Sequence, residues 1–253
     1  MLLLAIDSSA GASLALIRSG NVPDAAPEVL HSAETQVPNA HAEWLAPAVT
    51  EALTEVGLRG EELDGVVVGA GPGPFTGLRV GLALAHGLAE GWDVPLHGVC
   101  SLDSLALRAD DAGISGQFLA TSDARRRELY WARYESAEWA PEVWSPGKSS
   151  EFSGPPQAGC RLVEGPFVGP AEELPDLPSV GAGLWLYPDQ LTSAELAGAP
   201  ADPAAWTPHA VELGRLAHGA LTGELHGVLC APRPLYLRDS DAKVPAQMKG
   251  RAG

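Results

Sequence analysis

The segment from Gly69 to Gly81 is the part of this sequence whose composition most strongly suggests chemistry. It is rich in glycine, follows the β-branched run Val66–Val68 and opens onto a long apolar stretch. This order predicts a strand, a turn and a helix, an arrangement in which free backbone N–H groups and a helix dipole often bind phosphate. However, Pro72 and Pro74 remove N–H groups from the turn, and neither the P-loop nor the dinucleotide-binding pattern is matched. The sequence therefore favours a turn that sets the next helix closely against its neighbours.

The helix expected at 78–89 is apolar on almost every side, which predicts burial on more than one face. Small residues recur along it every four positions, at Gly77, Gly81, Ala85 and Ala89. Such a stripe lets another helix or a backbone segment approach closely. Two interpretations remain open: the helix is enclosed within this chain, or its second side meets another protein.

Carboxylate and hydroxyl groups end two strands of similar pattern. The strand expected at 2–6 leads into Asp7, Ser8 and Ser9, and a strand expected from 119 ends at Asp123. A return strand follows each of these turns. Two such lobes, with an Asp at the end of each first strand, are what an actin-like ATPase fold needs to grip nucleotide phosphates. The alternative is ordinary capping of each turn by its carboxylate.

Charge and metal-binding residues limit the possible functions. The chain has 253 residues and a formal net charge of −16, which opposes autonomous binding to nucleic acid. The run Arg125–Arg127 is a local exception, and a solvated turn is favoured there over a contact with nucleic acid or nucleotide. Three scattered cysteines and seven histidines form no metal-binding pair, and no apolar run approaches the length of a membrane span. A reduced, cytoplasmic protein is expected.

The order of the expected elements predicts an α/β fold of two ribonuclease-H-like lobes, which is the actin-like ATPase (ASKHA) architecture. Strands at 2–6, 12–18 and 29–37 precede a helix that begins near His41 and ends before Gly57, a strand at 66–69, the apolar helix and a strand at 95–100. The expected division is an N-terminal lobe over 1–105, a shortened C-terminal lobe over 106–238 and a flexible tail over 239–253.

Several short motifs, in this order, resemble the TsaB (YeaZ) family of bacterial tRNA threonylcarbamoyladenosine synthesis. The motifs are Leu4–Ser9, His41, Gly71–Gly81, Ser101-Leu102, Asp123–Arg126 and Pro234–Arg238. The family usually has Ser at the position of Pro74 and Thr at the position of Ser8. Neither departure changes the assignment.

The resemblance implies that this chain is a paralogue of the catalytic subunit, TsaD, but is not itself an enzyme. The two metal-binding histidines of TsaD correspond to Ser101 and Leu105 here. A lone hydroxyl is a poor metal ligand and Leu is none, so we expect no catalytic residues and no metal. No cofactor of its own is expected. Weak binding of ATP or ADP at Asp7, Ser8, Ser9 and Asp123, or binding only in the assembled complex, stays open.

The resemblance also implies a helix-bundle contact with TsaD, or a homodimer when TsaD is absent. We expect this interface to contain His41, Leu45, Gly77, Arg79, Gly81, Ala85 and Ala89. The implied function is a scaffold and activator for N6-threonylcarbamoylation of the adenosine next to the anticodon. The ATPase TsaE joins the complex, and tRNA is contacted only indirectly. The competing hypothesis is an autonomous ATP-dependent small-molecule kinase of the same fold.

Overall fold

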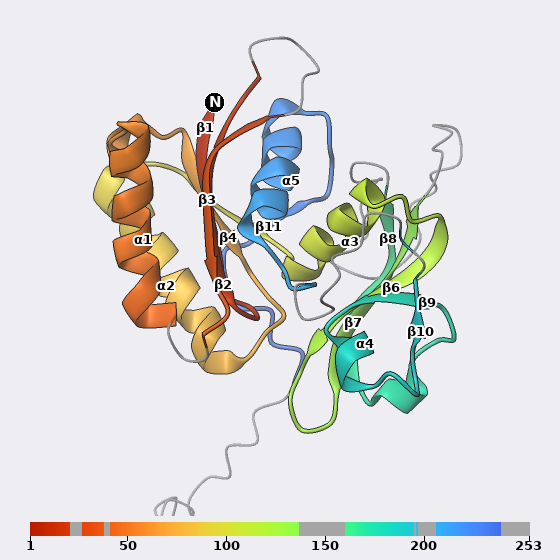
Figure 1. Ribbon diagram of the computed structural model, residues 1–253. Coiled ribbons are helices and arrows are strands. Elements are labelled where there is room, and N and C mark those ends of the chain that lie inside the picture. Colours follow the sequence, from red (N-terminus) through yellow and green to blue (C-terminus); the bar gives the residue numbers. More distant parts are fainter. Residues whose placement is uncertain (21–26, 38–40, 137–159, 195, 197–205, 239–253) are drawn as a thin grey trace, which may run out of the picture.

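The computed structural model describes residues 1–20, 27–37, 41–136, 160–194, 196 and 206–238. Its strands form two sheets, and Figure 1 shows them side by side with helices between them and on their outer faces. The strand order is β11-β5-β4-β1-β2-β3 in the first sheet and β10-β9-β6-β7-β8 in the second. The order of the first strand's neighbours is therefore the same in both lobes, which confirms the predicted α/β fold of two ribonuclease-H-like lobes.

The first sheet combines parallel and antiparallel pairs. Its strands are β1 (Leu2–Asp7), β2 (Ala12–Arg18), β3 (Glu28–Thr35), β4 (Gly65–Gly69), β5 (Leu96–Val99) and β11 (Leu229–Cys230). Strand β1 is antiparallel to β2 and parallel to β4. Leu4 and Ile6 enter the core on one face of the sheet, and Leu3 and Ala5 enter the core on the other. A strand buried on both faces reads as an unbroken apolar run, which is how this strand appears in the sequence.

The second sheet repeats this plan with shorter connections. Its strands are β6 (Gly116–Asp123), β7 (Leu129–Ser136), β8 (Cys160–Gly169), β9 (Pro178–Gly181) and β10 (Thr192–Ser193). Strand β6 is antiparallel to β7 and parallel to β9, as β1 is to β2 and β4. One 3-10 turn, η2 (Ala171–Glu173), and the four-residue helix α4 (Gly183–Leu186) lie between β8 and β10. The first lobe carries two long helices in the corresponding places.

The long helices lie on the outer face of the first sheet and between the two sheets. Helices α1 (His41–Val56) and α2 (Phe75–Trp92) cover the outer face of the first sheet, with the 3-10 turn η1 (Gly60–Glu62) between them in sequence. Helix α5 (Ala210–Thr222) covers the opposite face of this sheet, and α3 (Ser101–Asp111) packs on the second sheet and contacts α5. None of the described helices is long and apolar enough to cross a membrane.

The structure places part of the predicted C-terminal lobe with the N-terminal sheet. Helix α5 packs on β1, β2 and β4, and β11 pairs with β5, although both lie within the predicted 106–238 unit. Conversely, α3 begins before residue 106 and buries Leu102 and Leu105 against the second sheet. The cause is the apolar face of α5, which includes Leu213 and Leu216 and covers a sheet face that would otherwise be exposed. The predicted tail, 239–253, lies outside the described residues.

Helix α2 lies against the turn that joins β1 to β2. A Cβ atom at Gly81 would overlap the Ser8 hydroxyl, and one at Gly77 would lie 3.0 Å from the Ser8 carbonyl oxygen. Ala85 is fully buried, and Ala89 is 6% exposed in the same core. The small-residue stripe therefore packs inside this chain, as the first of the two interpretations held.

Two glycines of α2 make a matched test of this packing. We expect Gly81→Ala to lower the free energy of unfolding by about 1–3 kcal/mol, because the new methyl group overlaps Ser8. Gly87 has open space around its Cβ position, so Gly87→Ala should raise stability by about 0.5–1 kcal/mol through helix propensity. Urea unfolding followed by circular dichroism measures both. A stabilised Gly81→Ala variant would contradict the close contact.

Candidate functional site

Asp7, at the end of β1, is the centre of a buried hydrogen-bond network. Its Oδ1 accepts hydrogen bonds from the backbone N–H of Ser9 at 2.8 Å and from the Ser9 hydroxyl at 2.7 Å. Its Oδ2 accepts one from the Ser101 hydroxyl at 2.7 Å, and that hydroxyl accepts one from the N–H of Gly71. Burial raises the pKa of the Asp7 carboxyl above its usual value, although the bonds from Ser101 and Ser9 act in the opposite direction.

The glycine-rich block covers this network. A Cβ at Gly69 would overlap the Asp7 carboxylate, and one at Gly73 would lie 2.6 Å from the carbonyl oxygen of Ser9. The Ser8 hydroxyl donates a hydrogen bond to the carbonyl oxygen of Gly77 at 2.9 Å. The glycines thus allow the backbone of one turn to rest directly on the other.

The residues predicted to bind a nucleotide are engaged within the chain in this structure. Asp7, Ser8 and Ser9 are each no more than 2% exposed, and their side chains bond within the chain. In the second lobe, Asp123 Oδ1 accepts a hydrogen bond from the N–H of Arg125 at 2.6 Å and caps its own turn. Both carboxylates therefore do what the capping alternative describes.

The segment from Ser101 to Leu105 is part of the chain's internal packing. Ser101 bonds to Asp7, and Leu105 is fully buried in the second core. Between them, Asp103 accepts a hydrogen bond from the Tyr134 hydroxyl at 2.6 Å. Burial, together with the nearby Asp103 charge, raises the pKa of Tyr134 well above its usual value, so this hydroxyl stays protonated as the donor. Within the described part of the chain, no group of three His, Cys, Asp or Glu side chains is placed to hold a metal ion.

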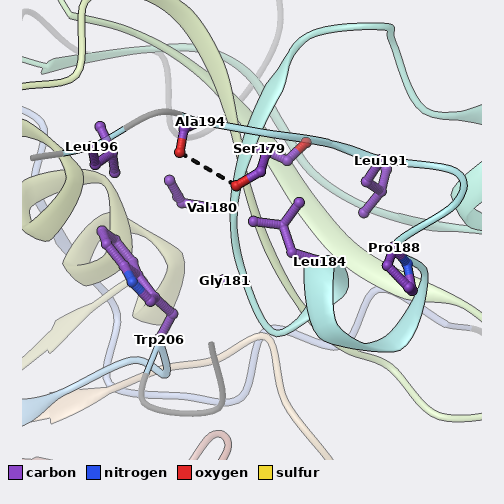
Figure 2. Close-up of a pocket in the computed structure, with 10 residues that line it drawn as sticks. Ser179, Val180, Gly181, Leu184, Pro188, Leu191, Ala194, Leu196 and Trp206 are labelled. Carbon is purple, nitrogen blue, oxygen red and sulfur yellow. Dashed lines mark hydrogen bonds between the residues drawn. The ribbon is translucent and has the colours of Figure 1, made fainter. Parts of the chain in front are cut away.

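A cavity of about 240 Å³ lies beside β9, α4 and Trp206 (Figure 2). Val180 and Gly181, at the end of β9, line this cavity. The rest of the lining is mostly apolar and contains no charged side chain. Contacts with Thr121 explain why glycine occupies positions 181 and 183. The carbonyl oxygen of Thr121 lies where a Cβ of Gly181 would be, and its hydroxyl accepts a hydrogen bond from the N–H of Gly183.

Most of the residues predicted for a partner interface are buried in their own chain. Leu45, Gly81, Ala85 and Ala89 are buried against their own chain, so this structure does not present them as a surface for a partner. The three remaining predicted residues are His41 and Gly77, which are half-buried, and Arg79, which is exposed. The physical reason is that the small residues of α2 fit against the β1–β2 turn.

The outward side of α1 and α2 has its own apolar character, which the sequence reasoning missed. On α2, Ala83, Gly87 and Gly91 are exposed beside the half-buried Val80, Leu84 and Leu88; on α1, Ala42, Ala46 and Pro47 are exposed. The spacing of small residues could have predicted this outward strip, because Ala83, Gly87 and Gly91 also recur every four residues, on the side of α2 opposite the buried stripe.

Asp7 should make the stability of the chain depend on pH. Because its pKa is raised above the usual 3.8, the folded chain binds this proton more tightly than the unfolded chain does. The contribution of Asp7 to stability is therefore greatest at low pH and falls as the pH rises from 3.8 through the folded pKa. Unfolding in urea at a series of pH values should show Asp7→Asn gaining stability relative to wild type as the pH rises. Asp93→Asn, at the exposed end of α2, is the reference; a flat Asp7→Asn difference would refute the assignment.

Comparisons with known proteins agree with this architecture. Residues 32–145 match a family model described as TsaD: tRNA N6-adenosine threonylcarbamoyltransferase. The tRNA threonylcarbamoyladenosine biosynthesis protein TsaB of Escherichia coli is 36% identical over 54% of this chain. An uncharacterized protein of Mycobacterium tuberculosis is 36% identical over 81% of it. The solved structure of YeaZ from Pseudomonas aeruginosa is 28% identical, covers 93% of this chain and all of the solved chain, and superposes with a TM-score of 0.68.

The extent of these matches differs among the relatives. The chain spans 57% of the Escherichia coli protein and 78% of the Mycobacterium tuberculosis protein. The likeness to YeaZ covers both lobes, and the two sheets of this chain have the strand order of the actin-like ATPase fold. The chain belongs to the TsaB (YeaZ) family of tRNA threonylcarbamoyladenosine biosynthesis proteins.

Proposed function

We propose that this chain is a non-catalytic scaffold and activator that pairs with TsaD for N6-threonylcarbamoylation of tRNA. The observation that carries the proposal is the outward face of α1 and α2. Ala83, Gly87 and Gly91 present a shallow, apolar strip there, flanked by half-buried leucines. A helix of a partner can approach such a strip closely at its three small residues, with the exposed Glu90 side chain beside them.

The likeness to TsaD supports this choice of partner. The region that matches the TsaD family model, residues 32–145, contains both α1 and α2. Paralogues that share these helices can pair through equivalent faces, so the same surface would also form a homodimer when TsaD is absent. The proposal includes the ATPase TsaE as a third component in the cytoplasm. ATP or ADP would bind in the assembled complex, because Asp7, Ser8 and Ser9 are covered in this chain.

The buried sites support a role without chemistry of its own. Asp7, Ser101 and Asp103 are each engaged by hydrogen bonds that join β1, the glycine-rich block, α3 and β7. These contacts fasten the two lobes to each other. A rigid chain with a prepared helix face is what a scaffold requires, since pre-organisation lowers the entropic cost of association.

The outward face is tested by Ala83→Arg and Gly87→Arg. Each places a long charged side chain in the strip, and each should weaken binding to TsaD by about 2 kcal/mol or more, roughly 30-fold in Kd. Isothermal titration calorimetry measures this directly. Both positions are exposed, so neither variant should lose thermal stability, and Gly87→Arg should gain up to about 1 kcal/mol through helix propensity.

The matched control is Leu221→Arg on α5, which is exposed on the opposite side of the first sheet. It should bind TsaD as wild type does. Equal binding by all three variants would show that the α1–α2 face is not the interface.

A further inference from the structure

The turn between β6 and β7 holds three consecutive arginines in a backbone conformation that arginine rarely adopts. The φ angles of Arg125, Arg126 and Arg127 are 61°, 56° and 64°, all in the left-handed region. Glycine and asparagine adopt this region at much lower cost than residues with long side chains. All three arginines are exposed, so packing does not explain their presence. Strained conformations of this kind are often kept where a side chain has a function.

The segment that follows β11, residues 234–238, holds this turn in place; we call it the C-terminal segment. The guanidinium group of Arg238 donates hydrogen bonds to the carbonyl oxygens of Ala124 at 2.9 Å and Arg125 at 3.3 Å. It also forms an ion pair with Glu128. The other acidic residue beside the turn, Asp123, pairs with Arg125 at 2.9 Å. Both carboxylates that flank the turn are thus engaged, and the turn is held in one shape.

The same segment presents an aromatic ring next to α2. Tyr236 stacks on Phe75 with ring centroids 5.5 Å apart, and the two side chains are 48% and 54% exposed. The guanidinium carbon of Arg79 lies 3.6 Å from the centroid of Phe75, and its Nε–H donates a hydrogen bond to the Tyr236 hydroxyl at 2.7 Å. Two half-exposed rings are therefore fixed beside a cation. In Figure 1 the N-terminal end of α2 and the tip of the β6–β7 hairpin lie at the same end of the molecule, low in the view.

Contacts through the C-terminal segment make these parts one continuous surface, which we call the arginine–tyrosine strip. It consists of Phe75, Arg79, Arg125, Arg126, Arg127, Tyr236 and Arg238. Five of the 16 basic residues of a chain with net charge −16 lie in it. A fixed row of cations next to exposed aromatic rings is the combination that binds single-stranded nucleic acid, because the cations neutralise phosphates and the rings stack on bases.

We propose that the arginine–tyrosine strip binds a single-stranded segment of RNA. The arginine turn contacts the phosphodiester backbone, and Tyr236 with Phe75 supports an unstacked base. This inference rests on the proposed function, which places tRNA in the complex, and it gives this chain a direct contact with that RNA. The acidic remainder of the chain restricts binding to the strip.

The test uses the full chain and a fluorescein-labelled single-stranded RNA, with binding measured by fluorescence anisotropy at several salt concentrations. The variant Arg125→Asn/Arg126→Asn/Arg127→Asn removes three charges while keeping a residue that tolerates the left-handed conformation. It should bind at least about 10-fold more weakly. Each phosphate contact on a single strand contributes roughly 0.7 to the magnitude of the slope of log K against log salt concentration. Loss of three contacts should therefore lower this magnitude by about 2.

A charge-matched control separates the strip from the net charge. Arg18→Asn/Arg59→Asn/Arg161→Asn removes three exposed arginines elsewhere and should change binding less than about 3-fold. Tyr236→Ala should weaken binding by about 5- to 100-fold through lost stacking, with the salt slope unchanged.

Three outcomes would overturn the proposal. They are no binding by the wild-type chain, an equal loss in the charge-matched control, and displacement of the RNA by ATP at equal phosphate concentration, which would indicate a mononucleotide site. Light scattering of each variant mixed with TsaD separates this inference from the proposed function. A variant that loses RNA binding but still pairs with TsaD shows that the strip binds RNA independently of the pairing. If the wild-type chain does not pair with TsaD, the proposed function is wrong, whatever the RNA result.

Discussion

The close contact between two turns, one after β1 and one after β4, is the constraint on which the rest of the structure depends. Gly73 and Gly81 bring the second turn and α2 directly onto Ser8 and Ser9. Asp7 is buried beneath them and bonds to Ser101 at the start of α3. This one junction therefore fixes the position of α2 on the first sheet and of α3 between the lobes. As a consequence, the chain's own backbone covers the β1–β2 turn, which is the turn that faces the nucleotide in an actin-like ATPase.

The same contact decides which side of α2 is available to a partner. The inner stripe of small residues is occupied by the β1–β2 turn, so a partner has access only to the outer one. In the described part of the chain, the covered inner stripe and the exposed apolar outer strip of α2 favour association through the outer side of the helix. The proposed scaffold function follows from these two features together with membership of the TsaB family. At one end of α2, the arginine–tyrosine strip adds a basic surface to an acidic chain.

Much of the fold could be predicted from the sequence because its signals are local. The apolar run Leu3–Ile6, the periodic helix α1 and the glycine-rich turn before α2 each have the pattern of the element that forms. The repeat of a strand that ends in Asp predicted the second lobe. The return of α5 to the first sheet was not predictable, because the apolar face of α5 matches either sheet equally well and only tertiary packing chooses between them.

The site was predicted less well than the fold, for a related reason. A stripe of small residues predicts that another part of a protein approaches the helix closely, but it does not identify that part. Gly81 and Ala85 looked like partner contacts, and they turned out to contact their own chain. Asp7 and Asp123 were correctly placed at strand ends, yet burial and capping bonds, which decide whether a carboxylate can bind a ligand, have no signature in one sequence.

The scaffold function requires this chain to activate TsaD without performing the reaction itself. The decisive experiment mixes the wild-type chain with TsaD from the same organism, then determines the mass of the complex by light scattering and threonylcarbamoyladenosine formation on tRNA in one sample. We expect a defined heteromeric complex whose activity depends on this chain, with no activity from this chain alone. Two separate species, with this chain transferring or hydrolysing the phosphate of ATP alone, would contradict the scaffold function.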